Sequence, residues 1–325
     1  GWSKPISCHR ASGHGTVTFA VGLQQSCNPV LMMTGMRVGQ QRFYEYFKYF
    51  GYGAKTGIDL PGETSTIYSS YKNFSVLSLA VYSFGQTFRT TPIQQLSAIS
   101  AVANGGTLVT PHLLDKIVDE DGNTIFEYGT DTKRQIVSSQ TCNTILSILE
   151  EGVSGNGAAK NAYVKGYKVA AKTGTSEKKD KKDENGQTPY RIGSCVAIAP
   201  SDDPQVTAII IVDEPMSGAV YGSVVAAPYV ANLLSSVLPY LGVEPQYTDD
   251  ELKNSEVTVS NYIGASVETA VNDLTYRGLA YEIVGEGETV TAQSPAPGSS
   301  VVRSSGKVIL YTGDETPKDT VTVPN

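Results

Sequence analysis

Residues 167–176, with the sequence YKVAAKTGTS, constrain the fold of this chain more than any other stretch. Their small apolar start predicts a buried strand over 167–173, and a polar edge follows it. Lys172 brings a positive charge to that edge, and Thr173 and Thr175 bring hydroxyl groups. Gly174 leaves room for another backbone to approach closely. We therefore expect a strand edge that pairs with an extended peptide and holds its carboxylate end.

The sequence after this stretch predicts a hairpin of two long strands. Apolar residues at 193–199 and 205–212 flank the turn-forming segment PSDDP. Residues 107–135 predict a smaller hairpin that turns at Asp121 and Gly122. Helical patterns occupy several other segments: 16–23, 30–50, 91–103, 138–152 and 222–241. Helical runs around clustered antiparallel strands indicate an α+β fold.

The tripeptide Lys-Thr-Gly occurs twice in the chain, so it is not specific by itself. The other copy, Lys55 to Gly57, lies in the segment FGYGAKTGIDLPGE at 50–63. The glycines and the proline of that segment predict a loop. The surroundings of the two copies must therefore distinguish them.

A joint between two helical pieces is predicted around Pro29. The residue before a proline is biased away from the helical conformation, so Ser26 and Asn28 lie at this joint. Polar side chains at such a joint can point into a cleft, or they can simply cap the next helix. The local sequence leaves both alternatives open.

Composition limits the classes of partner. The chain has 325 residues, of which 40% are hydrophobic and 18% charged, and this allows one large and one small domain. Its net charge of −7 shows no basic excess, so we expect no nucleic-acid binding. The lysines at 178–182 alternate with acidic residues and predict a solvated loop. The sequence contains no apolar run of about 18 residues, so it predicts no transmembrane helix.

The cysteine pattern predicts neither a metal site nor a redox motif. Cys8, Cys27, Cys142 and Cys195 form no C-x-x-C pair. Cys8 lies near His9 and His14, but their spacing fits no common zinc finger. Cysteines inside apolar runs are typical of buried thiols. We therefore expect no metal and no cofactor.

A second unit is expected after a polar linker at 244–255. This unit is expected at 256–313. Apolar residues recur at helical spacing over 266–279 and predict a helix there. Strands are predicted at 280–284, 289–293 and 307–311. The charged tail at 314–325 is expected to be disordered.

Several motifs in order are more specific than any one of them. They are Ser26-Cys27-Asn28, Ser83-Phe84-Gly85-Gln86, Thr91-Pro92-Ile93-Gln94, Ala103-Asn104-Gly105-Gly106 with Pro111, Lys172-Thr173-Gly174-Thr175 and Val212-Asp213-Glu214-Pro215. In this order they resemble the transpeptidase domain of class B penicillin-binding proteins, over about 5–242. The loop at 55–63 also resembles a family segment, which explains the first Lys-Thr-Gly as structural.

The second unit resembles a PASTA module. The residues that carry this resemblance are Val257-Thr258-Val259, Ile263-Gly264, Ala270, Leu274, Gly278-Leu279, Gln293-Ser294-Pro295-Ala296-Pro297-Gly298 and Val308-Ile309-Leu310. One such module after a class B domain is similar to the cell-division or sporulation branch of Gram-positive bacteria. The expected domains are thus a transpeptidase domain at 1–243 and a PASTA-like domain at 256–313.

The resemblance implies serine acyl transfer on peptidoglycan stem peptides that end in D-Ala-D-Ala, and binding of β-lactam antibiotics. It implies that Ser26 relays protons near the leaving amine and that Asn28 fixes a lysine and the substrate. Lys172 would supply positive potential, and Thr173 and Thr175 would bind the substrate carboxylate. Gly174 belongs to the same substrate-binding motif. The backbone N–H of Thr175 would be one oxyanion-hole donor.

The sequence departs from the family at the nucleophile. The family's Ser-x-x-Lys element should precede Ser26, and none is found there. Matches at 69–72, 176–179 and 304–307 come in the wrong order. We therefore expect an N-terminally truncated domain that lacks the nucleophile and is inactive by itself. The complete protein would carry a membrane anchor upstream and act at the extracytoplasmic face of the bacterial membrane.

Two alternatives remain at this point. The chain could be a non-catalytic scaffold that binds peptidoglycan, β-lactams, or division or sporulation proteins. It could also be a serine β-lactamase or β-lactam sensor, although the PASTA-like unit and the Thr-Pro-Ile-Gln segment disfavour this.

Overall fold

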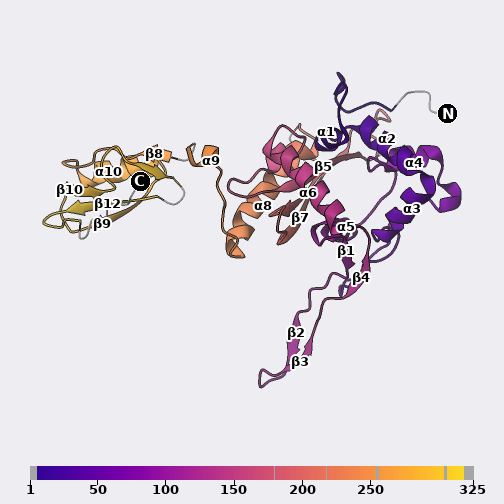
Figure 1. Cartoon of the computed structure of the whole chain (residues 1–325), viewed down its shortest axis with the longest axis horizontal. Helices are drawn as coiled ribbons and strands as arrows, with labels where there is room; N and C mark the ends of the chain where they lie inside the picture. Colours follow the sequence, from indigo (N-terminus) through magenta and orange to yellow (C-terminus); the bar gives the residue numbers. More distant parts are fainter. Residues whose placement is uncertain (1–5, 179, 217, 254–255, 304–305, 318–325) are drawn as a thin grey trace. The chain divides into compact units, whose positions relative to one another are not determined.

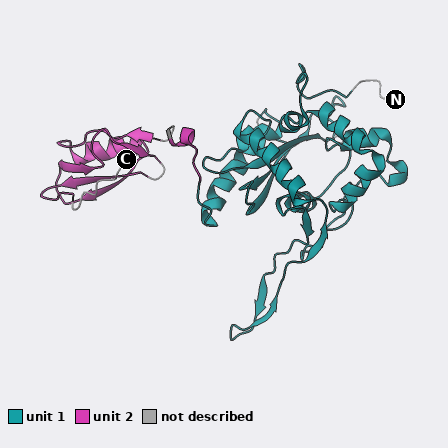
Figure 2. Ribbon diagram, in the orientation of Figure 1, with its two compact units in different colours: residues 1–245 teal, residues 246–325 magenta. Residues whose placement is uncertain are grey.

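The computed structural model describes residues 6–178, 180–216, 218–253, 256–303 and 306–317. These residues form two compact units, 1–245 and 246–325 (Figure 2). The division lies two residues beyond the expected end of the first domain at 243. Helices surround sheets whose strand pairs are antiparallel except for β9 with β12 (Figure 1), so the predicted α+β class is confirmed.

The first unit is built on a three-stranded antiparallel sheet in the order β5-β6-β7. These strands are β5 (Ala170–Glu177), β6 (Arg191–Ala199) and β7 (Val206–Asp213). The predicted hairpin of two long strands is therefore confirmed. The expected strand at 167–173 starts later and ends later, because β5 pairs with β6 from Ala170 through Glu177. The polar motif consequently lies inside a paired strand.

Helices cover both faces of this sheet (Figure 1). The buried leucines of α8 (Ala227–Tyr240) pack on one face against alanines of all three strands. On the other face, Leu146 of α6 (Ser139–Ser154) packs on Ala170 and Ile198, beside α5 (Pro92–Ala103). Thr91 caps α5 in a capping box, and Pro92 stands at the first helical position.

The predicted helix at 222–241 is two helices, α7 (Gly222–Val225) and α8. They are separated at Ala226, and Pro228, which lacks a backbone N–H, stands in the first turn of α8. The stretch Gly222–Tyr240 is also long and apolar enough to cross a membrane by composition alone. Because Val230, Leu234 and Leu238 are fully buried in the sheet's core, we assign it to the domain interior.

The N-terminal helices are α1 (Phe19–Gln24), α2 (Asn28–Val38), α3 (Gln40–Tyr49) and α4 (Val76–Tyr82). The single helix expected at 30–50 is broken at Gly39, whose positive φ of 85° ends α2. A short 3-10 helix (Tyr71–Asn73) precedes α4. Aromatic side chains of this region, including Phe47, Phe74 and Tyr82, form a second core.

A β-hairpin projects from the base of this unit (Figure 1). Its outer pair is β2 (Lys116–Val118) with β3 (Thr124–Glu127), which confirms the predicted turn around Asp121 and Gly122. Its base is β1 (Thr107–Val109) paired with β4 (Thr132–Gln135). A further 3-10 turn (Lys160–Ala162) follows α6.

The second unit has its own core around α10 (Val267–Tyr276). The three predicted strands are present as β9 (Ala280–Val284), β10 (Val290–Ser294) and β12 (Lys307–Thr312), and they form a sheet in the order β10-β12-β9. The pair β8 (Glu256–Thr258) and β11 (Ser300–Val302) was not predicted. The linker contains α9 (Asp249–Lys253), and the tail beyond 317 lies outside the described residues.

Candidate functional site

Strand β5 offers a backbone edge beside its polar motif. Among the described residues it pairs with β6 alone. The side-chain amide of Gln86 donates to the carbonyl of Thr175 over 3.4 Å, so the backbone of Thr175 faces away from β6. Backbone groups alternate in direction along a strand, so those of Thr173 face the same way. This side of β5 can pair with an extended peptide.

Ser26 and Lys172 meet next to this edge, although 146 positions separate them. The Lys172 Nζ atom donates to Ser26 Oγ over 2.6 Å and to the Thr173 carbonyl over 3.0 Å. Ser26 lies between α1, which Thr18 caps, and α2. Its φ of 52° is uncommon for a residue with a side chain, and such strain clusters at functional sites.

The alternative that Ser26 and Asn28 merely cap a helix is wrong. The residue before α2 is Cys27, and no side-chain hydrogen bond caps that helix. Asn28 is the first residue of α2, and its amide donates to the Ser7 carbonyl over 3.4 Å. The amide of Asn28 is thus directed at the N-terminal segment, and its role in fixing a lysine and a substrate stays a prediction.

The charge of Lys172 is weakened by its surroundings. Burial lowers the pKa of Lys172 from 10.5 to about 8, and the neighbouring Cys195 opposes this only in part. Burial likewise raises the pKa of the Cys195 thiol to about 12, so this thiol stays neutral near pH 7. Lys172 can therefore exist in both protonation states close to neutral pH, which suits proton transfer.

The start of α7 packs directly on the polar motif. The backbone N–H of Gly222 donates to Thr175 Oγ1 over 3.1 Å. A Cβ atom on Gly222 would lie 2.3 Å from the Gly174 carbonyl oxygen and 2.2 Å from that of Ser194. Only glycine therefore lets α7 lie this close to β5 and β6.

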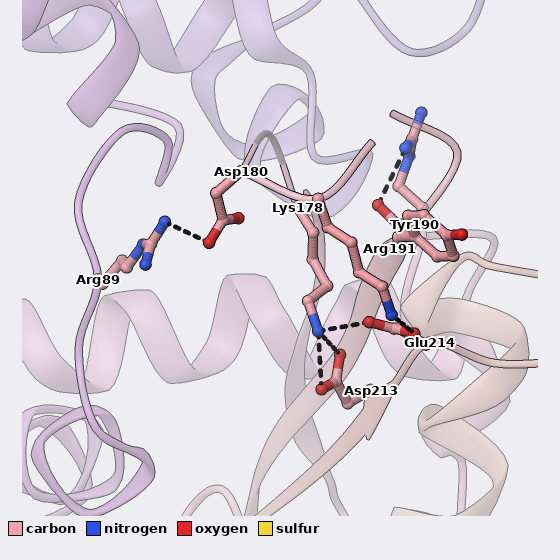
Figure 3. Close-up of polar contacts among 8 residues, drawn as sticks. Arg89, Lys178, Asp180, Tyr190, Arg191, Asp213 and Glu214 are labelled. Carbon is pink, nitrogen blue, oxygen red and sulfur yellow. Dashed lines mark hydrogen bonds and ion pairs between the residues drawn. The ribbon is translucent and has the colours of Figure 1, made fainter. Parts of the chain in front are cut away.

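Ion pairs tie the loop after β5 to the end of β7 (Figure 3). Lys178 Nζ lies 2.9 Å from an Asp213 carboxylate oxygen and 2.7 Å from one of Glu214. Lys181 pairs with Glu214 over 2.6 Å, and Asp180 with Arg89 over 3.0 Å. The expected solvated loop is present, since Asp180, Lys181 and Lys182 are exposed, and acidic residues distant in sequence pair with Lys178 and Lys181.

The first Lys-Thr-Gly copy has a different environment. The backbone N–H groups of Thr56 and Gly57 donate to the Glu63 carboxylate over 2.6 and 3.0 Å, and the Thr56 hydroxyl donates over 2.7 Å. This closes the loop on itself, so the polar groups of Thr56 and Gly57 are occupied, as expected for a structural element.

The Ser-x-x-Lys matches lie in varied places. Ser69 adjoins the aromatic core, where its N–H donates to the Tyr82 hydroxyl over 2.9 Å. Ser176 lies in β5 and pairs with Ile192. Lys179, Ser304 and Ser305 lie outside the described residues. The absence of a nucleophile in the family's order stays a prediction.

The structure thus brings Ser26 together with Lys172, Thr173, Gly174 and Thr175. Sequence reasoning missed Gln86 and Gly222 as neighbours of this motif. Gln86 was part of a recognised motif, and its amide could have been assigned to the strand edge. Gly222 carried no signal, because its requirement comes from backbones distant in sequence.

Comparisons with known proteins agree with this arrangement. Residues 2–235 match the penicillin binding protein transpeptidase domain, and residues 257–314 match the PASTA domain. Stage V sporulation protein D of Bacillus subtilis (strain 168) is 36% identical over 320 residues, covering 97% of this chain and 49% of that protein. The chain therefore spans about half the length of this relative.

Solved structures show the same fold. Penicillin binding protein 3 from Mycobacterium tuberculosis, complexed with ampicillin, is 28% identical with a TM-score of 0.64, over 71% of this chain and 52% of that chain. Penicillin Binding Protein 2X from Streptococcus thermophilus shares the fold at 21% identity and a TM-score of 0.58, over 91% of this chain and 44% of that chain. The predicted family, a class B penicillin-binding protein with one PASTA module, is confirmed, and the chain belongs to the penicillin-binding protein transpeptidase family.

Proposed function

We propose that this chain supplies the substrate-binding half of a peptidoglycan D,D-transpeptidase, which cross-links stem peptides by serine acyl transfer. The observation that carries the proposal is the 2.6 Å contact between Lys172 Nζ and Ser26 Oγ beside the outward-facing edge of β5. The family match supports the same reaction class. In the family, the attacking serine belongs to a Ser-x-x-Lys element. No such element is found before Ser26 in this sequence.

Each residue of the half-site has a defined task in this proposal. Ser26 accepts a hydrogen bond from Lys172, so its own hydroxyl hydrogen is available for the nitrogen that leaves when the D-Ala-D-Ala amide breaks. Lys172, with a pKa of about 8, then restores the proton to Ser26, and the hydroxyl proton that the attacking serine loses returns Lys172 to its charged form. The leaving D-alanine departs as a neutral amine, and the remaining acyl group stays on the attacking serine.

The threonines orient the substrate. Thr175 Oγ1 accepts from Gly222, so its hydroxyl hydrogen can donate to the terminal carboxylate of the peptide. Thr173 lies two residues earlier on the same face of β5 and adds a second hydroxyl. The outward backbone N–H of Thr175 stabilises the oxyanion of the tetrahedral intermediate.

We extend the proposal to ligand class and location. The relative from M. tuberculosis is complexed with ampicillin, so a β-lactam is the expected covalent ligand of the complete site. Stage V sporulation protein D suggests a role in sporulation or division. If peptidoglycan is the substrate, the reaction takes place at the extracytoplasmic face of the membrane.

The first test uses the complete encoded protein. We expect a fluorescent penicillin to label it covalently. In the same protein, Ser26→Ala or Lys172→Met should slow labelling about 10²–10⁴-fold. Ser235→Ala, an exposed serine of α8, is the matched control and should label normally. Absence of labelling in the complete protein, or normal labelling of both site variants, would contradict the proposal.

The nucleophile prediction is tested separately with residues 1–325 alone. We expect no adduct with fluorescent penicillin on a denaturing gel. An adduct that survives denaturation would show that a serine within these residues attacks β-lactams. That result would refute the prediction that residues 1–325 lack the nucleophile. It would leave the transpeptidase proposal intact.

A further inference from the structure

Three metal-binding side chains converge beside Ser26. The thiols of Cys8 and Cys27 and the imidazole of His14 place their ligating atoms within 4.8 Å of one another. The Cys8 Sγ atom lies 3.4 Å from His14 Nδ1. The sequence spacing of Cys8 and His14 suggested no finger, because Cys27 comes from a joint between helices much later in the chain.

The backbone around these residues is shaped to bring them together. The N–H of Gly13 donates to the Arg10 carbonyl over 2.9 Å, which turns the loop between Cys8 and His14. Gly13 and Gly15 flank His14 with positive φ angles of 66° and 64°, which favour glycine. On the other side, the N–H of Cys27 is held by the Gly22 carbonyl over 2.8 Å. Both halves of the cluster are thus fixed by backbone hydrogen bonds.

The chemistry of the cluster selects the kind of ion. Two thiolates and an imidazole form a soft set that favours Zn²⁺ over Mg²⁺ or Ca²⁺. In tetrahedral zinc sites the bonds of about 2.0–2.3 Å leave sulfur and nitrogen ligands roughly 3.5 Å apart. The observed 3.4 Å between Cys8 Sγ and His14 Nδ1 fits this geometry. His9 Nδ1 also lies 3.6 Å from Cys8 Sγ, but His9 is not among the residues whose ligating atoms all lie within 4.8 Å of one another.

We propose that Cys8, His14 and Cys27 bind one Zn²⁺ ion, with the fourth position open to water. The ion would join the loop at 6–15 to the joint that carries Ser26 and Asn28. The hydrogen bond from the Asn28 amide to the Ser7 carbonyl already links these two segments, and the ion adds a stronger connection. The site uses none of the residues on β5, but it shares with the transpeptidase proposal the joint that carries Ser26 and Asn28, so its test measures metal binding and not labelling by penicillin.

Titration of the reduced, metal-free chain with Co²⁺ tests this site. We expect one Co²⁺ per chain, with a thiolate-to-cobalt charge-transfer band and the visible bands of tetrahedral cobalt, and displacement of Co²⁺ by Zn²⁺. Cys8→Ser and His14→Gln should each weaken binding by more than the roughly 10–100-fold that losing a hydrogen-bond partner of a ligand costs. Cys142→Ser, another thiol of the same unit, is the matched control and should bind normally.

A second readout keeps the result interpretable. Adding Zn²⁺ should slow the exchange of amide protons over 6–15 and 25–28 in the parent chain. It should leave these exchange rates unchanged in His14→Gln. Position 14 is partly exposed, so this variant should fold. Equal weakening by Cys142→Ser and Cys8→Ser would overturn the site, as would parental binding in His14→Gln. Formation of a Cys8–Cys27 disulfide by the reduced chain in air while Zn²⁺ stays in solution would also overturn it.

Discussion

The contact between Lys172 and Ser26 places two costly features at one point. A buried ammonium group loses hydration, and a serine at positive φ is strained. Neither feature improves the packing of the fold. The surrounding helices and β5 hold both in place, which is the usual relation between a site and its scaffold.

Lys172→Met should make stability less dependent on pH. The folded chain releases the Lys172 proton at about pH 8, and the unfolded chain releases it near 10.5. Between these values the unfolded state binds more protons, so the free energy of unfolding rises with pH. Below pH 8 the full penalty applies, and at 1.36 kcal/mol per pKa unit it is at most about 3 kcal/mol.

The measurement is urea unfolding of parent and variant at pH 7 and pH 10. Lys172→Met should be the more stable at pH 7, with the advantage shrinking by pH 10. Cys195 and His9 are the titratable neighbours and are present in both proteins. Lys168→Met is the control, because Asp202 raises the pKa of Lys168 and reverses the sign. An equal difference at both pH values would show that burial does not shift the pKa of Lys172.

At the scale of elements, the close packing of α7 on β5 and β6 depends on Gly222, which has no Cβ atom. Gly222→Ala would place that atom against the carbonyl oxygens of Gly174 and Ser194, so α7 must move away. We expect a loss of about 1–3 kcal/mol or more in the free energy of unfolding. Gly129→Ala, where a Cβ atom meets nothing within 4 Å, should be nearly neutral in the same urea titration. Similar values for the two variants would contradict the close packing.

The loop after β5 should be held by charge in a salt-dependent way. Lys178→Met removes the pairs with Asp213 and Glu214. Exposed pairs contribute only about 0–1 kcal/mol each, so global stability should change little. Limited proteolysis within 180–190 should become faster, and added salt should bring the parent close to the variant. The control Lys168→Met removes the separate pair with Asp202 and should leave cleavage there unchanged.

At the scale of the whole molecule, each unit carries its own buried core. The core of the second unit consists of residues between Val257 and Leu310, and that of the first lies on the β5–β7 sheet. We therefore expect two calorimetric transitions. Gly222→Ala should lower only the first unit's transition, and Leu310→Ala only the second's, by about 2–5 kcal/mol. A shift of both transitions by either variant would refute independent folding.

Many features of the fold could be predicted from interactions between residues close together in the sequence. The caps at Thr91 and Ser266, the turn at Gly122 and the alternation in β6 and β7 act within a few residues. The order of short motifs also identified the family and predicted Lys172 as the cation of its substrate site. Such signals survive in a sequence because they depend on neighbours in the chain.

Distant neighbours decided the rest. The sequence could not distinguish a capping Ser26 from one that meets Lys172, because that choice depends on how α1 and α2 pack beside β5. It could not show that Asp213 and Glu214 neutralise Lys178, or that Cys27 joins Cys8 and His14. The sequence by itself determined the α+β class, the family and the motif on β5, because each is written in local patterns. Only the tertiary structure decided which side chains share a site, because those contacts form when packing joins segments far apart in the chain.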